Sequence, residues 1–503
     1  MLRSVFRNVA ISAAAFVAVS VVGLLLVPVL IRTYGLAGFG HIALARLFLP
    51  MTTLAFLDFG VGESATQIVA RARADGNWQR AAGLLTLTAC TALSTGLVAA
   101  LVLAGLAVWL PVWLGVPIAG QAGLARVFMV TGALMPLLFL ALVLEGIVKG
   151  FERFDAMRTF EVVAALSYAA MALLAVWGGH DENAVCYGLL VSLLLRAAMA
   201  GAMAFQVLKG KGMLPRAAPA EDRGWFSTQT RAMGANKVLG SAQSQWPPLA
   251  VALLLGPTAV GVFDALSRLP RAVKGVMGLL SSTVLPLATR LESAADEKGM
   301  QRLGQAGVLL VGLISLPPLA AVMAFSAPVL RLWLGEAMAP LWGWQALLFL
   351  VPACSVLVGF GGAALLVRPH VVRTMNKIIA VQIVLQYSLS LLAVHWLQER
   401  AFFLGQVLAV AFTFVAQMRL VKVEMKLPAE THFALLRLLG VMVALALPGL
   451  FCARWVQGWP SLLLALVTWT LLCWLLCARL VLTASQRARL IATLRARLTR
   501  PAP

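Results

Sequence analysis

The stretch "YGLAGFGHIALARL" (34–47) has a counterpart in "LGPTAVGVFDALSRL" (255–269). Gly35 and Gly40 in the first match Gly256 and Gly261 in the second, 221 positions later, and both stretches then enter an apolar segment that carries an arginine. Further along, "VWLG" (112–115) matches "LWLG" (332–335), 220 positions later. Two matches at nearly the same offset indicate an internal duplication, which restricts the folds open to this chain.

The composition is that of a membrane protein. Of the 503 residues, 61% are apolar and 12% are charged, and the mean hydropathy is +0.92. Soluble domains are closer to half apolar and a quarter charged. Apolar stretches of about 20 residues recur along the whole chain, which predicts helices and not a barrel. The first of them, 9–31, is too long for a cleavable signal peptide and predicts a first span.

We therefore expect an all-α integral membrane protein with about fourteen transmembrane helices. The predicted spans are 9–31, 42–67, 83–109, 124–147, 158–178, 185–208, 233–255, 258–289, 303–325, 342–366, 375–394, 402–418, 433–453 and 459–478.

Basic residues are concentrated on every second predicted loop. Thirty of the 40 fall on the termini and one set of loops, and the other set holds only Arg32, Arg331, Arg400 and Arg454. The positive-inside rule then predicts cytoplasmic N- and C-termini and an even number of spans. Because the cations are spread over loops and form no single patch, the net charge of +21 does not indicate nucleic-acid binding.

The duplication predicts the organisation of the chain. We expect an N-terminal six-helix lobe (1–208), a cytoplasmic linker (209–232), a C-terminal six-helix lobe (233–426), two extra helices (427–482) and a basic amphipathic cytoplasmic tail (483–503). Six spans is an even number, so both lobes insert the same way up and form a parallel repeat around a central cavity. In transporters built this way the substrate lies between the halves, which rock against each other.

Several motifs, in their order along the chain, resemble one family. "PVLIRTYGLAGFG" (28–40) followed by "LDFGVGESATQIVAR" (57–71) is similar to the opening of Wzx-type polysaccharide flippases, members of the multidrug/oligosaccharidyl-lipid/polysaccharide (MOP) exporter superfamily. "LEGIVKGFERFDAMRTFEV" (144–162) resembles that family's linker between spans four and five, and "VLRLWLG" (329–335) a later landmark.

The resemblance implies a function and a location. A protein of this family sits in the bacterial inner membrane and moves undecaprenyl-pyrophosphate-linked oligosaccharide units from the cytoplasmic to the periplasmic leaflet. The partners it implies are the lipid-linked oligosaccharide, the bilayer, and a polysaccharide polymerase with its chain-length regulator. The surface polysaccharide could be O-antigen (the lipopolysaccharide side chain), capsule or exopolysaccharide.

The predicted eighth span carries an unusual set of charges. At 100° per residue, Asp264, Arg268, Arg271 and Lys274 lie within an arc of about 120°, on one helix face with a net charge of +2. Such a face requires a hydrated cavity, and a pyrophosphate or anionic sugar is a suitable counterion because arginine binds phosphate oxygens bidentately. The alternative is that these cations pair with acids on neighbouring helices, or that Lys274 reaches the membrane surface.

The second span adds Arg46 near its outer end, Asp58 further in and Glu63 near its inner end. One interpretation is that Asp58 faces the cavity and pairs with Arg268 or Arg271 in one conformational state. The other is that Asp58 caps the turn in "DFGVG". For Glu63 we favour a position at the membrane surface.

Other polar residues in predicted spans complete the candidate site. Arg196 lies mid-span and needs a partner or water. Gln243 and Gln245 stand in "SAQSQWPPLAV" (241–251), where many relatives carry an acid, so acid-dependent coupling at this position is in doubt. Glu145 and Glu161 flank a basic loop, and we expect surface pairing with its cations.

The sequence does not favour an enzyme. No nucleophile–base pair, long outer loop or Walker-type phosphate-binding motif is present, and the six cysteines show no metal-ligand spacing, so we expect no catalytic residue, metal or cofactor. Alternatives from the same superfamily are a peptidoglycan-precursor flippase and a cation-coupled multidrug exporter. A membrane enzyme of polysaccharide assembly, such as a polymerase or ligase, is a more distant alternative.

Overall fold

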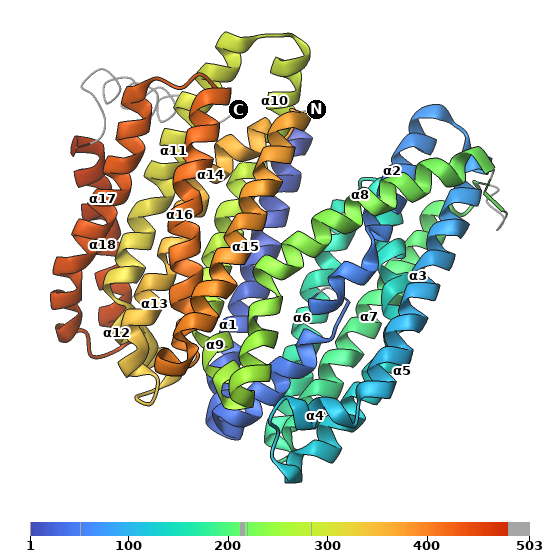
Figure 1. Ribbon diagram of the computed structural model, residues 1–503, viewed down its shortest axis with the longest axis horizontal. Coiled ribbons are helices and arrows are strands. Elements are labelled where there is room, and N and C mark those ends of the chain that lie inside the picture. The colour runs from blue at the N-terminus through green and yellow to red at the C-terminus, as the bar shows by residue number, and fades with distance from the viewer. Residues whose placement is uncertain (1, 51, 212–216, 219, 283, 481–503) are drawn as a thin grey trace. The chain divides into compact units, whose positions relative to one another are not determined.

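The computed structural model describes residues 2–50, 52–211, 217–218, 220–282 and 284–480, and in these ranges every regular element is a helix (Figure 1). The chain divides into two compact units, Met1–Arg268 with Tyr387–Phe402, and Leu269–Gln386 with Phe403–Pro503. The expectation of an all-α membrane protein is confirmed.

The first unit contains most of the N-terminal helices. They are α1 (Leu2–Leu47), η1 (Thr53–Asp58), α2 (Val61–Asp75), α3 (Trp78–Leu106), α4 (Trp109–Trp113), α5 (Ile118–Gly150), α6 (Phe154–Trp177), α7 (Glu182–Leu208), α8 (Ala220–Ser244) and the first part of α9 (Trp246–Ser282). Helix α5 is central, since it packs against α2, α3 and α7, and α6 packs against α1 and α7 (Figure 1).

The second unit holds the remaining helices, except for parts of α15 and α16 that belong to the first. They are α10 (Val284–Ser293), α11 (Glu297–Ala324), α12 (Ser326–Leu334), η2 (Ala339–Leu341), α13 (Trp342–Leu348), α14 (Leu350–Leu365), α15 (Pro369–Leu397), α16 (Arg400–Glu424), α17 (Ala429–Cys452), η3 (Ala453–Trp455) and α18 (Trp459–Leu480). Here α11 is central, packed against α14, α17 and α18 around a core that includes Leu316, Phe349 and Leu357.

Twelve helical stretches in the described part of the chain are long and apolar enough to cross a membrane. The predicted count of fourteen is therefore not confirmed. Two predicted spans differ in form. The span 42–67 is divided between the end of α1, the short helix η1 and the start of α2, and the span 233–255 is divided between α8 and α9. Neither α2, with 15 residues, nor the polar α8 is among the twelve.

The repeated glycines mark the sharpest bends in the chain. Within α1 the helix turns at Gly35, with φ 69° and ψ −179°, and within α9 it turns at Gly256, with φ 81° and ψ −176°. Residues with a side chain rarely adopt such a positive φ, so glycine is favoured at both bends. The two bends have nearly the same backbone geometry, as a duplicated segment should.

The second glycine of each repeat lies in a reciprocal contact with the other repeat. A Cβ atom added to Gly40 would lie 2.0 Å from the carbonyl oxygen of Pro257, and one added to Gly261 would lie 2.3 Å from that of Leu36. Leu36 and Pro257 are themselves equivalent positions of the repeat. A contact in which each copy offers the same patch to the other is what a two-fold rotation produces. The duplicated segments thus meet locally as a symmetric pair.

The predicted boundaries of the lobes stay predictions. Within the predicted linker 209–232, the described residues from Ala220 onward belong to α8. The basic tail 483–503 lies outside the described residues.

Candidate functional site

A buried ion pair joins α5 to α7. Arg196 donates from Nε to Oε1 of Glu145 at 2.6 Å and from Nη2 to Oε2 at 2.8 Å, a bidentate arrangement. The Glu145 side chain is only 4% exposed and that of Arg196 is 16% exposed. Glu161 on α6 lies 3.8 Å from Arg196 and Lys149 lies 3.9 Å from Glu145. The partner that Arg196 requires is therefore Glu145. The expected pairs with the basic loop are also present, since Lys149 lies near Glu145 and Arg158 donates to Glu161 at 2.6 Å, although Glu145 is buried and not at the surface.

The second buried ion pair involves Asp58. Its Oδ1 accepts a hydrogen bond from the backbone N–H of Val61 at 3.1 Å, at the start of α2. Its Oδ2 accepts from Nζ of Lys237 on α8, which also lies 3.0 Å from Glu63. The turn-capping interpretation of Asp58 is therefore correct. Its ion-pair partner in this structure is Lys237, and pairing with Arg268 or Arg271 in another conformational state stays a prediction. Glu63 is half exposed, and its position at the membrane surface also stays a prediction.

These ion pairs lie beside two neighbouring pockets in the first unit. One, of about 200 Å³, is lined by Arg46, Glu145 and Arg196 among apolar residues of α1, α5 and α7. The other, of about 240 Å³, is lined by Asp58, Glu63, Glu145, Lys149 and Lys237. Pro50, Leu142 and Glu145 line both pockets. The sequence-predicted residues Arg46, Arg196, Asp58 and Glu63 are thus brought together along one polar path, with Glu145 at its centre.

A third group contains the first two charges of the α9 stripe. Arg268 donates from Nε to Oδ2 of Asp264 at 2.9 Å, one helical turn earlier, and both side chains are mostly buried. The guanidinium also lies over the ring of Phe39, 5.1 Å from its centroid, and contacts the carbonyl of Gly23 on α1 at 3.4 Å.

The remaining predicted residues lie on α9 and around the end of α8. Arg271 and Lys274 are exposed on the part of α9 that belongs to the second unit. Gln243 and Gln245 are half-buried around the end of α8. The helical conformation of α9 across residues 264–274 retains the predicted single face of four charges.

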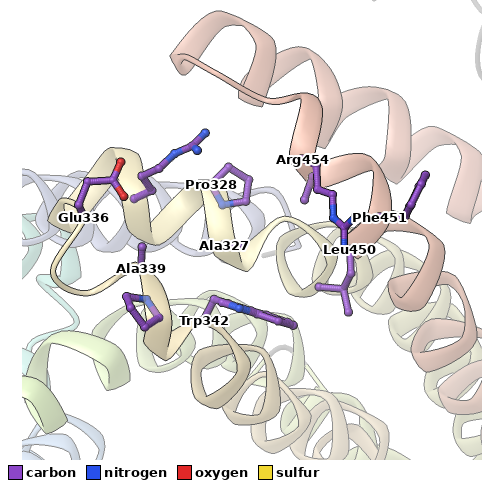
Figure 2. A pocket seen from close by; sticks show the side chains of 11 residues that line it. Ala327, Pro328, Glu336, Ala339, Trp342, Leu450, Phe451 and Arg454 are labelled. Atoms are coloured by element: carbon purple, nitrogen blue, oxygen red, sulfur yellow. The ribbon is translucent and has the colours of Figure 1, made fainter.

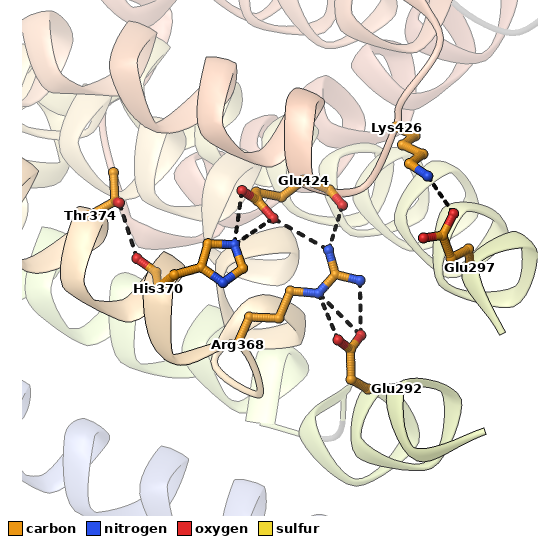
Figure 3. Close-up of polar contacts among 7 residues, drawn as sticks. All are labelled: Glu292, Glu297, Arg368, His370, Thr374, Glu424 and Lys426. Atoms are coloured by element: carbon orange, nitrogen blue, oxygen red, sulfur yellow. Dashed lines mark hydrogen bonds and ion pairs between the residues drawn. The ribbon is translucent and has the colours of Figure 1, made fainter. Parts of the chain in front are cut away.

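A separate group of charges lies at the ends of four helices of the second unit, α10, α11, α15 and α16 (Figure 3). Arg368 donates from Nη2 to Glu292 of α10 at 2.9 Å and from Nη1 to the backbone carbonyl of Glu424 of α16 at 2.9 Å. The hydrogen bonds to Glu292 raise the pKa of Arg368, although burial opposes this. His370 lies 3.1 Å from the Glu424 carboxylate, and Lys426 bonds Glu297 of α11. This cluster cross-links helix ends and lines no pocket described here.

The polar path can accommodate exchange between ion-pair partners. Buried charges are stable only when paired and hydrogen-bonded, and removing one partner strands the other. Glu145 already has two cationic neighbours, and Lys237 has two acidic ones. An incoming anion could take over one of the two cations beside Glu145 while the other cation stays with the carboxylate.

Sequence reasoning missed Glu145 and Lys237 as members of the site. Glu145 carries a signal that could have identified it, since it is a charged side chain inside an apolar helical segment. Lys237 had been counted with the cytoplasmic cations, and only the packing of α8 against η1 brings it to Asp58.

The fold and the site define a class: a multi-pass helical membrane protein with a repeated glycine-containing segment and ion pairs buried among its helices. Comparison with known families assigns it more narrowly. Residues 5–292 match the model of the family described as polysaccharide biosynthesis protein, which is more than half of the chain. The chain therefore belongs to this family.

One curated relative supports the same assignment over a short stretch. The uncharacterized membrane protein EpsK of Bacillus subtilis is 29% identical over 85 residues, a match that spans 17% of this chain and 17% of that protein.

The solved structures most relevant here are transporters. The lipid II flippase MurJ in an inward closed conformation has a TM-score of 0.69 at 12% identity, over 93% of this chain and 97% of that one. An inward-facing MATE multidrug transporter of the MOP superfamily has a TM-score of 0.64 at 13% identity, over 82% and 98%. The MATE transporter VcmN of Vibrio cholerae gives 0.61 at 14%, over 86% and 98%. The resemblance to the MOP fold is confirmed.

Proposed function

We propose that this protein is a flippase that moves polyprenyl-pyrophosphate-linked oligosaccharide units from the cytoplasmic to the periplasmic leaflet of the bacterial inner membrane. The observation that carries the proposal is a path of ionised side chains within the apolar helices of a polysaccharide biosynthesis family member. A sugar headgroup cannot cross hydrocarbon unaided, because each unpaired polar group costs several kcal/mol. The polyprenyl tail can remain in lipid, so the protein needs to solvate only the headgroup.

The charges support an anionic cargo. The stripe on α9 holds three cations and one acid, and Asp264 is already paired with Arg268. Arg271 and Lys274 lie one and two turns further along the same face. We infer that the pyrophosphate binds to this face and that Arg46 and Arg196 contact the sugar or its acidic substituents. Asp58, Glu63 and Asp264 act as exchange partners that keep the cations compensated when no cargo is bound, and Gln243 and Gln245 offer neutral hydrogen bonds.

Transport by alternating access of two lobes follows from the duplication. The reciprocal contact of Gly40 and Gly261 supports a rotation axis between the repeats, and the charge bias of the loops supports cytoplasmic termini. A polymerase and its chain-length regulator would consume the translocated unit on the outer face. The proposed role involves no covalent chemistry.

Deleting the gene and identifying the lipid-linked intermediate that accumulates tests the substrate class. We expect a polyprenyl-pyrophosphate carrying a complete oligosaccharide repeat unit. Accumulation of a peptidoglycan precursor would instead support the alternative flippase, and accumulation of no lipid-linked sugar with a changed drug sensitivity would support an exporter.

The anion site is tested by measuring polysaccharide export together with membrane abundance. Arg271→Ala should abolish export from normally inserted protein. Arg268→Ala should abolish export as well, but with lower membrane abundance, because it strands Asp264 in a mostly buried position. Arg271→Lys should restore it only in part, because a point charge does not reproduce a bidentate guanidinium. Asp264→Asn should be milder, since the cations remain. Full export by a well-inserted Arg268→Ala/Arg271→Ala variant would contradict the site assignment.

A further inference from the structure

We propose that the second unit holds a separate binding site for a phosphate-bearing lipid headgroup at the outer face of the membrane. The site is a pocket of about 600 Å³ between α12 and η2 on one side and the α17–η3 junction on the other. Figure 2 shows Arg454 and Leu450 on one wall, with Trp342, Ala339 and Glu336 on the other. Ligand pockets commonly have volumes of about 300–1,000 Å³.

The first argument is the concentration of rare charges. The predicted outer loops carry only four arginines in the whole chain, and two of them, Arg331 and Arg454, line this one pocket. Each is held by a contact that does not neutralise it. Arg331 donates from Nη2 to the carbonyl oxygen of Val456, and Arg454 lies over the ring of Phe451 at 5.3 Å. Within the described residues, neither guanidinium forms an ion pair, so both are available to an anion.

The second argument is the position of the pocket relative to the membrane. Trp342 and Phe451 line it, and Phe451 packs edge-on against Trp455 with ring centroids 5.6 Å apart. Trp455 and Trp459 are 69% and 50% exposed. Tryptophan is enriched where helices leave the hydrocarbon for the headgroups, so this group of rings marks the headgroup level.

The surroundings fit the rest of a lipid molecule. Beyond the pocket, α17 and α18 expose large apolar side chains, among them Leu447, Leu463, Leu464 and Val467. Acyl or prenyl chains can lie along these faces while the phosphate meets the arginines. Arginine donates to two phosphate oxygens at once, which gives both strength and orientation. Glu336, which is exposed and lines the same pocket, would accept hydrogen bonds from headgroup hydroxyls.

Two lipids carry the required phosphate: a bulk anionic phospholipid and a polyprenyl diphosphate. The inference rests on the predicted orientation of the chain. It does not depend on which cargo binds along the polar path in the first unit. The experiment therefore measures binding and not transport, so that failure of the cargo assignment leaves its result unaffected.

The test is retention of lipid by purified full-length protein. The protein is reconstituted in phosphatidylcholine nanodiscs that contain a minor fraction of phosphatidylglycerol, and retained lipid is counted by native mass spectrometry. We expect Arg331→Gln and Arg454→Gln each to weaken retention about tenfold, the effect of losing one charge-assisted contact. Arg400→Gln is the matched control, because Arg400 is an outer-loop arginine that does not line the pocket.

Displacement identifies the lipid. If farnesyl diphosphate displaces phosphatidylglycerol from the wild type but not from the arginine variants, the site takes a prenyl diphosphate. If farnesyl diphosphate does not displace phosphatidylglycerol, the site takes bulk phospholipid.

Because Arg331 also bonds Val456, Arg454→Glu provides a second variant at an exposed position that can fold normally. Retention by Arg454→Glu equal to that of the wild type and of Arg400→Gln would overturn the proposal.

Discussion

Substituting the second glycine of either repeat tests the symmetric crossing of the two copies. A Cβ on Gly40 would lie 2.0 Å from the Pro257 carbonyl oxygen, and real Cβ atoms do not approach closer than 3.0 Å, so the backbones must separate by about 1 Å or more. Overpacking costs about 1–3 kcal/mol, and because a backbone carbonyl cannot rotate away, Gly40→Ala should fall at the upper end. Gly261→Ala should behave alike, since its Cβ would lie 2.3 Å from the Leu36 carbonyl.

The control is Gly23→Ala, also within α1, where an added Cβ meets nothing within 4 Å. There the helix should gain about 0.5–1 kcal/mol, because alanine loses less conformational freedom than glycine on folding. The assay is the thermal unfolding midpoint of purified protein in lipid-containing detergent. We expect the double variant at Gly40 and Gly261 to lose less than the two single losses together, because the first side chain already separates the helices. Equal midpoints for Gly40→Ala and Gly23→Ala would refute the reasoning.

Three further predictions concern charges. Arg196→Ala should destabilise the protein by about 3–5 kcal/mol, because it strands Glu145 in a buried site, whereas Glu145→Gln/Arg196→Gln should recover most of the loss; equal membrane abundance of Arg196→Ala and wild type would contradict this. Arg80 donates to Asp222 from Nε at 2.9 Å and thereby lowers the pKa of Asp222, so this pair should stabilise the protein above about pH 4 and lose its effect as the pH falls through the folded-state pKa. Unfolding midpoints should therefore separate wild type from Asp222→Asn above pH 4 and converge below it, and a constant difference would argue against the pair. Cysteines introduced at Gln79 and Ala217 should react with a membrane-impermeant maleimide only from the cytoplasm, and one at Gly179 only from the periplasm, as the loop charges predict; labelling of Ala217 in intact cells would contradict the orientation.

The sequence predicted those features that depend on amino-acid composition and on regularly repeated patterns along the chain. Hydropathy and loop charge are summed over many residues, so the helical membrane fold follows from them. The glycine repeat identified Gly35 and Gly256 as equivalent positions, but the bends at these glycines were recognised only in the structure. The helix count was less secure, since the predicted spans 42–67 and 233–255 fall partly on α2 and α8, which are too short or too polar to count as membrane spans.

The ion-pair partners of residues that lie on different helices could not be predicted in the same way. A helical wheel put Asp264 and Arg268 on one face, and their ion pair follows from that spacing. The partners of Asp58 and Arg196 lie 179 and 51 positions away, and depend on which helices pack together and at what rotation. The bidentate Glu145–Arg196 pair therefore appears only in three dimensions.

The most direct test of the central claim is the leaflet in which lipid-linked oligosaccharide accumulates when this protein is depleted. In spheroplasts, a sugar-binding lectin that cannot cross the membrane is added to the outside, and the fraction of lipid-linked oligosaccharide that the lectin binds is measured. A flippase predicts accumulation in the inner leaflet, out of reach of the lectin, until the wild-type gene is restored. Accumulation in the outer leaflet would contradict the account, because the protein would then act after translocation.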